Sequence, residues 1–238
     1  MQAHRHRFPE QSVAERALGQ AFWLGERGGV RYSIGTPMTK PPALRVHLHH
    51  TSGLVSEFEQ EDEEGAAAFL GHLNPRKIFT TKLLILGEFF SVSNVATAHL
   101  ARIDVLTDQP IACQFPDWVL DLVMIPTREQ FLAAAGLDSG QAKARAASVA
   151  PGEMIEGYVA CHLLGAEPVY ARIQGALTMP LELRSRFVHL FDLPFIQFRR
   201  EEGGTTLINP AHLVRITTFP GPSGLGAADV WPAELVTL

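Results

Sequence analysis

The chain of 238 residues predicts a mainly β protein of the α+β class, with two tandem small sheet-like or barrel-like modules, an N-terminal helix and a helical connector. The first observation behind this prediction is a repeat: Ala98–Ile103 recurs 113 residues later as Ala211–Ile216, with five of six residues alike. The second is that the same shift superimposes apolar strand patterns upstream of the hexapeptide. The third is the alternation of apolar and polar residues between Gly-containing turns, which is typical of short strands.

Composition places the chain among globular proteins, because 46% of its residues are hydrophobic and only 19% are charged. No apolar run reaches the roughly 18 residues that cross a bilayer, and the N-terminus lacks the apolar stretch of a secretory signal. Two cysteines, Cys113 and Cys161, are too few for a disulfide framework. The net charge of −5 argues against nucleic acid as a partner. A cytoplasmic protein that binds no membrane is therefore expected.

Residues 1–42 are expected to form the N-terminal helix and a lead-in to the first module. Ser12-Val13-Ala14-Glu15 has the spacing of a capping box, in which the serine and glutamate side chains each satisfy an exposed backbone N–H group. Apolar residues then recur on one helical face. Residues 26–42 are rich in Gly and Pro and complete the lead-in.

The first β module is predicted over residues 43–125. Apolar and polar residues alternate from Leu44 to His49, and a second strand through Phe58 follows the turn Thr51-Ser52-Gly53. Ala66–Leu73 is helix-like. A second hairpin then begins with the apolar strand at Leu83, turns within Gly87–Asn94, and ends in the hexapeptide. The apolar stretch Phe115–Ile125 either closes this module or packs between the two modules.

Residues 126–152 are predicted to be the helical connector. Thr127 and Gln130 have capping-box spacing, and the helix that they begin is expected to end near Gly136. Residues 137–152 are rich in Ala, Gly and Ser, which is typical of a second short helix or of a solvated linker.

The second β module is predicted over residues 153–219, followed by an irregular tail at 220–238. Its first hairpin pairs strands around Val159 and Tyr170, and its turn, Leu164–Glu167, is expected to supply about two extra residues. Leu181–Leu190 is helix-like. The second hairpin turns at Arg199–Gly204, where two glycines tolerate the positive φ of a tight turn. Both modules are thus expected to consist of a hairpin, a short helix and a second hairpin, which predicts an internal duplication. The alternative is that the two segments are halves of one β-sandwich whose strands share a periodicity by chance.

Ten histidines raise the possibility of a metal site. His47 and His49 lie two apart on a predicted strand and share a face, and His50 or the acidic run could add a third ligand. No His-Glu-x-x-His or Cys-x-x-Cys pattern is present. Outward-facing histidines on a half-buried strand need no metal, so no metal site and no cofactor are predicted.

The pairs His99/Arg102 and His212/Arg215 recur in both modules. Residues three apart on a strand point to opposite faces of the sheet. The two side chains of one pair therefore cannot bind the same ligand unless a β-bulge brings them to one face. A structural role is therefore expected, in which each histidine caps a turn or bonds a neighbouring carbonyl at the start of a strand and each arginine lies on the outer face.

The remaining candidates give no catalytic constellation, so no catalytic residue is predicted. The acidic residues are a solvated loop or a docking surface for a basic partner: Glu57, Glu59, Glu61, Asp62, Glu63 and Glu64. Gly221–Gly226 lacks the lysine and the spacing of a phosphate loop. Cys113 and Cys161 lie among apolar residues, as inert thiols do. Arg199 and Arg200 precede Glu201 and Glu202, so the turn is charge-balanced.

The hairpin Phe195–Ile216 contains Ile208-Asn209-Pro210-Ala211-His212-Leu213 followed by Ile216. This pattern, Ile-Asn-x-x-His-Leu-x-x-Ile, resembles small β modules of uncharacterised bacterial proteins. The resemblance covers about twenty residues of the second module and implies a small β fold without an activity; in the first module only Ala98–Ile103 matches, and Ala96 stands where the second has Asn209.

Two classes of function follow from this pattern. The first is a non-enzymatic interaction or regulatory protein that binds a protein partner through sheet edges, the acidic loop or an apolar face between the modules. The sequence pattern is also compatible with a homo-oligomer of this chain. The second is a small-ligand binder or enzyme with its site in the cleft between the modules. A deep pocket with several titratable residues between the modules would favour the second.

Overall fold

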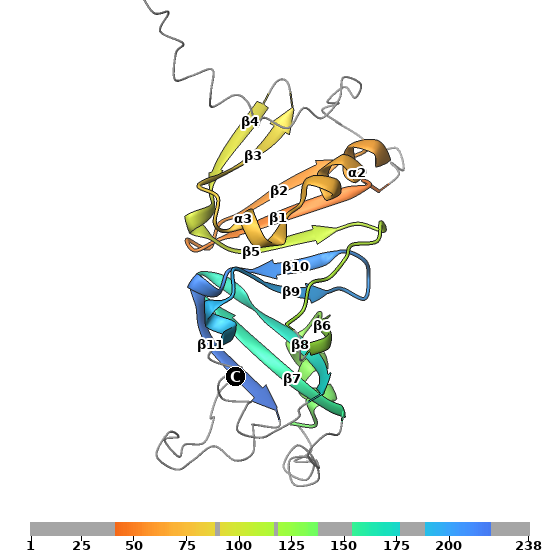
Figure 1. Cartoon of the computed structure of the whole chain (residues 1–238), viewed down its shortest axis with the longest axis vertical. Coiled ribbons are helices and arrows are strands. Elements are labelled where there is room, and N and C mark those ends of the chain that lie inside the picture. Colours follow the sequence, from red (N-terminus) through yellow and green to blue (C-terminus); the bar gives the residue numbers. More distant parts are fainter. Residues whose placement is uncertain (1–40, 89–90, 117–118, 138–153, 177–188, 220–238) are drawn as a thin grey trace, which may run out of the picture.

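The computed structural model describes residues 41–88, 91–116, 119–137, 154–176 and 189–219 (Figure 1). The mainly β fold predicted from the sequence is confirmed: nine strands form one mixed sheet, two form a separate hairpin, and short helices accompany them. The N-terminal helix, most of the connector after Gly136, most of the helix-like stretch before Leu190, and the tail lie outside the described residues. None of the helices within the described ranges has the length and apolar character needed to cross a membrane.

In chain order, the elements are β1 (Leu44–His50), β2 (Val55–Gln60), α2 (Glu63–His72), α3 (Pro75–Ile78), β3 (Leu83–Glu88), β4 (Ser91–Ala96), η2 (Thr97–His99), β5 (Leu100–Leu106), β6 (Val119–Ile125), α4 (Arg128–Ala135), β7 (Met154–Leu163), β8 (Ala166–Ala176), β9 (Ile196–Arg199), β10 (Thr205–Ile208), η3 (Pro210–His212) and β11 (Leu213–Phe219).

The large sheet has the strand order β11-β7-β8-β6-β9-β10-β5-β1-β2, and β3 pairs only with β4. All neighbours are antiparallel except β6 and β9, which are parallel. Strands β1–β5 form the first half of the molecule and β7–β11 the second. The two halves meet where β10 pairs with β5, across the middle of Figure 1.

Local sequence signals account for the elements that were predicted. Along β1, Leu44, Val46 and Leu48 are buried and Arg45 is exposed, as the alternation requires. At the start of α4, the Thr127 side chain accepts a hydrogen bond from the Gln130 N–H, which confirms the predicted cap. The same helix ends at Gly136, in the left-handed conformation with φ +67°.

Two predicted turns are shorter in the structure. The β7–β8 turn is Leu164-Gly165, and it adds no residues to the strand. Leu48 pairs with Ser56 in β1–β2, and Cys161 pairs with Val169 in β7–β8, so the shift of 113 holds on both strands. Strand β3 extends to Glu88 and β4 begins at Ser91, so only two residues lie between the strands. The predicted turn, Gly87–Asn94, is shorter because residues at both of its ends pair with each other in the β3–β4 ladder.

Strand β6 lies in the second half, although it follows the first half in the chain and was assigned to the first module. It pairs with β8 along most of its length and touches β9 at Val123 and Arg199. The apolar stretch therefore neither closes the first module nor packs between the modules. It fills a position between two strand edges of the second half, where its backbone groups find partners.

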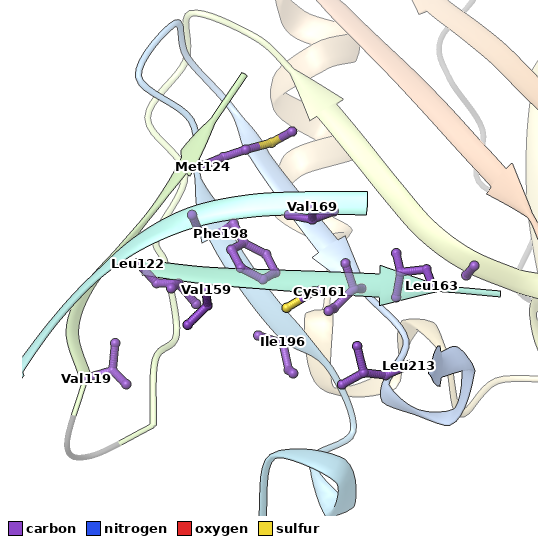
Figure 2. Close-up of a cluster of buried hydrophobic side chains, with 13 residues drawn as sticks. Val119, Leu122, Met124, Val159, Cys161, Leu163, Val169, Ile196, Phe198 and Leu213 are labelled. Atoms are coloured by element: carbon purple, nitrogen blue, oxygen red, sulfur yellow. The ribbon is translucent and has the colours of Figure 1, made fainter. Parts of the chain in front are cut away.

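Two large apolar cores lie on the two sides of the junction, and each also takes in a residue of the other half: Leu207 of β10 belongs to the first core and Ala101 of β5 to the second. In the second half, Phe198 is fully buried, and Figure 2 shows it among Leu122, Val159 and Cys161, which come from β6 and β7. The core of the first half gathers β1 and β5 with the helices α2 and α3, and β3 and β4 pack partly buried leucines and a valine against it. These cores position the polar groups at the junction of the halves.

Candidate functional site

The described residue with the densest set of polar contacts is Asp104, at the junction of the two halves. Only 3% of Asp104 is exposed. The guanidinium of Arg102 donates to it from Nε at 2.9 Å and from Nη2 at 2.6 Å. His49 Nε2 lies 2.9 Å from Oδ2, and Thr206 Oγ1 donates to Oδ1 at 2.7 Å. We call Asp104, Arg102, His49, Thr206 and Arg200 the Asp104 cluster.

Strand pairing brings these residues together from distant parts of the chain. Asp104 is on β5, between β1 and β10. Its pairing partners are His47 on β1 and Thr206 on β10, while Arg102 pairs with His49. Arg102 and Asp104 are two apart on one strand, so their side chains share a face. The cluster therefore needs both the β1–β5 and the β10–β5 registers.

The environment of Asp104 favours its ionised form. Burial would raise its pKa, but hydrogen bonds from His49, Arg102 and Thr206 and the charge of Arg102 hold the pKa far below its usual range. Arg200 Nη1 lies 3.8 Å from Oδ1, which brings a second guanidinium to the carboxylate. The Nε of Arg200 is buried and has no hydrogen-bond partner among the described residues. Two cations thus share one carboxylate.

A possible metal-ligand group exists at this place, but its third member differs from the one considered in the sequence. Ligand atoms of His47, His49 and Asp104 all lie within 4.8 Å of one another. His50, the earlier candidate, instead has its Nε2 3.1 Å from Ser56 Oγ. Asp104 already accepts several hydrogen bonds, and the Arg102 guanidinium beside it repels a cation. The donor set suits an ion pair better than a metal ion.

Of the acidic residues that were considered as further ligands, Glu59 and Asp62 have other side-chain contacts. Glu59 pairs with Arg45 across β1 and β2 at 2.8 Å, with both side chains about half exposed. Asp62 caps α2, where its side chain accepts from the Gly65 N–H at 2.6 Å, and Glu63 and Glu64 lie in the first helical turn. Carboxylates are favourable at that end of a helix because of its partial positive charge. A local structural role therefore accounts for Asp62.

The repeated His/Arg pairs differ between the two halves. His212 Nε2 lies 2.8 Å from the carbonyl oxygen of Ala98, as expected for a histidine that bonds a carbonyl. Arg215 is exposed and contacts His162 at 2.8 Å. Arg102, in contrast, is buried, so the expectation of an outer position is wrong for it. The reason is Asp104: the matching position in the second half is Thr217, which offers no charge.

Of the other predicted candidates, only Arg200 belongs to the Asp104 cluster. Burial raises the pKa of Cys161 to about 12, and burial also raises the pKa of Cys113, so both thiols are poor nucleophiles at neutral pH. Arg199 pairs with Asp121 at 2.7 Å, and Arg200 pairs with Glu202. The Gly-rich segment 221–226 lies outside the described residues.

The sequence carried one signal for this cluster that local pattern reading missed: Arg102 and Asp104 are opposite charges two apart in a strand pattern that is otherwise apolar. In the structure their charges are mutually satisfied, and Thr206 is fully buried. The cluster joins β1, β5 and β10. Comparison of the chain with family models, with curated proteins and with solved structures finds no match.

Proposed function

We propose that the chain is a non-enzymatic interaction or scaffold protein, made from an internally duplicated β module, that accepts an extended strand of a partner protein along the edge of β11. Its two free thiols fit a reducing compartment such as the cytoplasm.

Matching registers support the duplication. His49 pairs with Arg102 in β1–β5, and His162 pairs with Arg215 in β7–β11. Both ladders skip one residue at the same place, Ala101 in the first and Val214 in the second, which is a further coincidence at a shift of 113. The N–H groups of Thr51 and Leu164 donate to the carbonyls of His99 and His212, both at 2.9 Å. Two sandwich halves with a shared periodicity would not need the same bulge.

The observation that carries the interaction role is the unequal pairing of β5 and β11. β5 has β1 on one side and β10 on the other, whereas β11 pairs only with β7 among the described strands. Ala101 on β5 is fully buried, but its counterpart Val214 is 66% exposed. An open strand edge with an apolar residue is a template for strand addition. Within the chain, β10 already uses the matching edge of β5 in this way.

A ligand site between the modules has less support. β10 pairs with β5 at the junction, and all four of its residues are buried. Titratable groups do gather there, as that alternative requires. However, Asp104 is buried and its oxygens are bonded to Arg102, His49 and Thr206, so these groups satisfy each other.

The test compares two charged substitutions on exposed aliphatic residues. Val214→Lys places a charge on the β11 edge, whereas Leu120→Lys changes a residue of similar exposure on β6, which has neighbours on both sides. Proteins retained by the wild-type chain from native lysate are identified and their binding is then measured with purified components. Val214→Lys should weaken that binding at least about tenfold, or about 1.4 kcal/mol, and Leu120→Lys should retain it. Equal binding by both variants would contradict the proposal.

A further inference from the structure

The two halves have the same strand order except at one position. In the second half the order is β11-β7-β8-β6-β9-β10. In the first half the corresponding strands are β5-β1-β2, followed by the separate β3–β4 hairpin. Between β2 and β3, at the position that corresponds to β6, the described residues provide no strand. Figure 1 shows the β3–β4 hairpin beyond β2, at the upper end of the molecule.

The strand that fills this position in the second half comes from the other half of the chain. β6 follows β5 after the twelve residues 107–118 and then pairs antiparallel with β8. A counterpart would follow β11 and cross in the opposite direction. It would begin after the twelve residues 220–231, a length that can span up to about 40 Å when extended.

A matching sequence stands at that place. Trp118–Ile125 reads WVLDLVMI, and Trp231–Leu238, 113 residues later, reads WPAELVTL. Both segments begin with Trp, have an acidic residue at the fourth position, continue with Leu-Val and have an aliphatic residue at the eighth position. The single proline, Pro232, matches Val119, the first residue of β6, where a strand tolerates proline. The shift is the one that relates the strand registers of the two halves.

The first half also lacks the burial that β6 gives to the second. β3 starts with four apolar residues, Leu83-Leu84-Ile85-Leu86, of which Leu83 is 53% exposed and none is fully buried. In β9, which occupies the corresponding position beside β6, Ile196, Gln197 and Phe198 are all buried. When a further strand covers apolar side chains that are exposed on its neighbour, their burial stabilises the folded state.

We propose that residues 232–238 add to the open edge of β2 in the same chain, antiparallel to it and next to β3, as the counterpart of β6. The inference depends on the duplication proposed above and is independent of the role of β11. The occupant is this segment of the chain rather than a foreign strand, because its sequence repeats that of β6 and its linker has the same length.

The β6–β8 register gives the new pairing residue by residue. Val123 pairs with Arg172, so Val236 should lie opposite Glu59. Directly opposed residues in antiparallel strands have Cα atoms about 4.5–5.5 Å apart, which is within the range that a disulfide bridges. Glu59 is replaceable because its ion pair with Arg45 is exposed and such pairs contribute little stability.

The closing experiment is a disulfide test on the full chain with Cys113→Ser as background. Glu59→Cys with Val236→Cys should form an intrachain disulfide under mild oxidation, detected by mass and by mobility without reductant. Thr218→Cys with Val236→Cys, on the open edge of β11, is the matched control and should stay reduced. No intrachain bond in the first variant, equal bonding in both, or a disulfide-linked dimer would each overturn the inference. Retained partner binding at β11 would show that the proposed function is unaffected.

Hydrogen exchange gives a second, independent test. Leu235 corresponds to the buried Leu122, and Ala233 to the exposed Leu120. Leu235→Asp should speed amide exchange in β2 and β3 about tenfold or more, since their edge hydrogen bonds are lost, while exchange in β8 and β9 stays unchanged. Ala233→Asp should have little effect. Unchanged exchange in β2 and β3 of Leu235→Asp would contradict the inference.

Discussion

At the scale of single residues, Asp104 is the buried charge on which the junction depends. Asp104→Asn would leave the buried Arg102 without its counter-charge and Arg200 with Glu202 alone, and the expected loss is about 3–5 kcal/mol in the free energy of unfolding. Urea denaturation measures it. Asp121→Asn is the matched control, because the Asp121–Arg199 pair is partly exposed and should contribute no more than about 1 kcal/mol. Equal losses in the two variants would show that the Asp104 cluster is not a buried ion pair.

The same carboxylate predicts a dependence of stability on pH. The folded-state pKa of Asp104 is lowered, so its contribution is present above the unfolded-state pKa of about 3.9 and is lost as the pH falls toward the folded-state value. The difference in stability between the wild-type chain and Asp104→Asn should therefore narrow between about pH 5 and pH 2. Thermal unfolding over this range measures it. A difference that widens with acid would contradict the assignment.

Metal binding is a further prediction at this scale. We expect no tight Zn²⁺ binding through His47 and His49, because the Asp104 oxygens are held by Arg102 and the guanidinium repels a cation. Calorimetric titration of the purified chain with ZnCl₂ measures it. One equivalent of bound zinc that is lost in the variant His47→Ala/His49→Ala would show the prediction to be wrong.

At the scale of elements, the hairpin turns β1–β2 and β7–β8 contact each other. Gly165 has φ +69°, and a Cβ added there would lie 2.0 Å from the carbonyl oxygen of Thr51. Gly165→Ala should therefore lower the free energy of unfolding by more than about 1 kcal/mol. Gly71→Ala, in α2 with open space around it, should raise it by about 0.5–1 kcal/mol. Thermal unfolding compares them, and a neutral Gly165→Ala would contradict the contact.

Elements set by local signals were predictable from the sequence. The alternation from Leu44 to His49 predicts β1, and the Thr127 cap with Gly136 predicts both ends of α4, because each depends on residues that are neighbours in the chain. The position of β6 was not predictable in this way. Its residues Val123 and Met124 are both buried although they are adjacent, so no alternation shows which strands cover them.

The candidate site could be predicted only in part for a related reason. His47 and His49 share a face of one strand, and this is visible in the sequence. Asp104 lies opposite His47 because of the β1–β5 register, which joins residues 57 positions apart. Thr206 adds a further pairing between the two halves. A register between strands that are distant in the chain depends on the whole fold, and no local pattern fixes it.

At the scale of the whole molecule, the β5–β10 pairing makes one sheet of the two halves. The buried Asn209 Nδ2 donates to the carbonyl of Leu100 at 3.1 Å, which adds a side-chain bond across the same junction. We expect a single unfolding transition, with calorimetric and van't Hoff enthalpies that agree. Asn209→Ala should lower stability by about 1–3 kcal/mol and keep the single transition. Two separate transitions in calorimetry would show that the halves unfold independently.

The crossing of β6 has a consequence for how the chain can be divided. A break between α4 and β7 would leave β6 on the N-terminal fragment, while its neighbours β8 and β9 would belong to the C-terminal fragment. Two sets of backbone hydrogen bonds would then join the fragments. One set links β6 to β8 and β9, and the other links β5 to β10. Neither fragment could complete its sheet alone. The chain is thus suited to fragment complementation, in which two separately produced pieces regain one structure only when they are mixed.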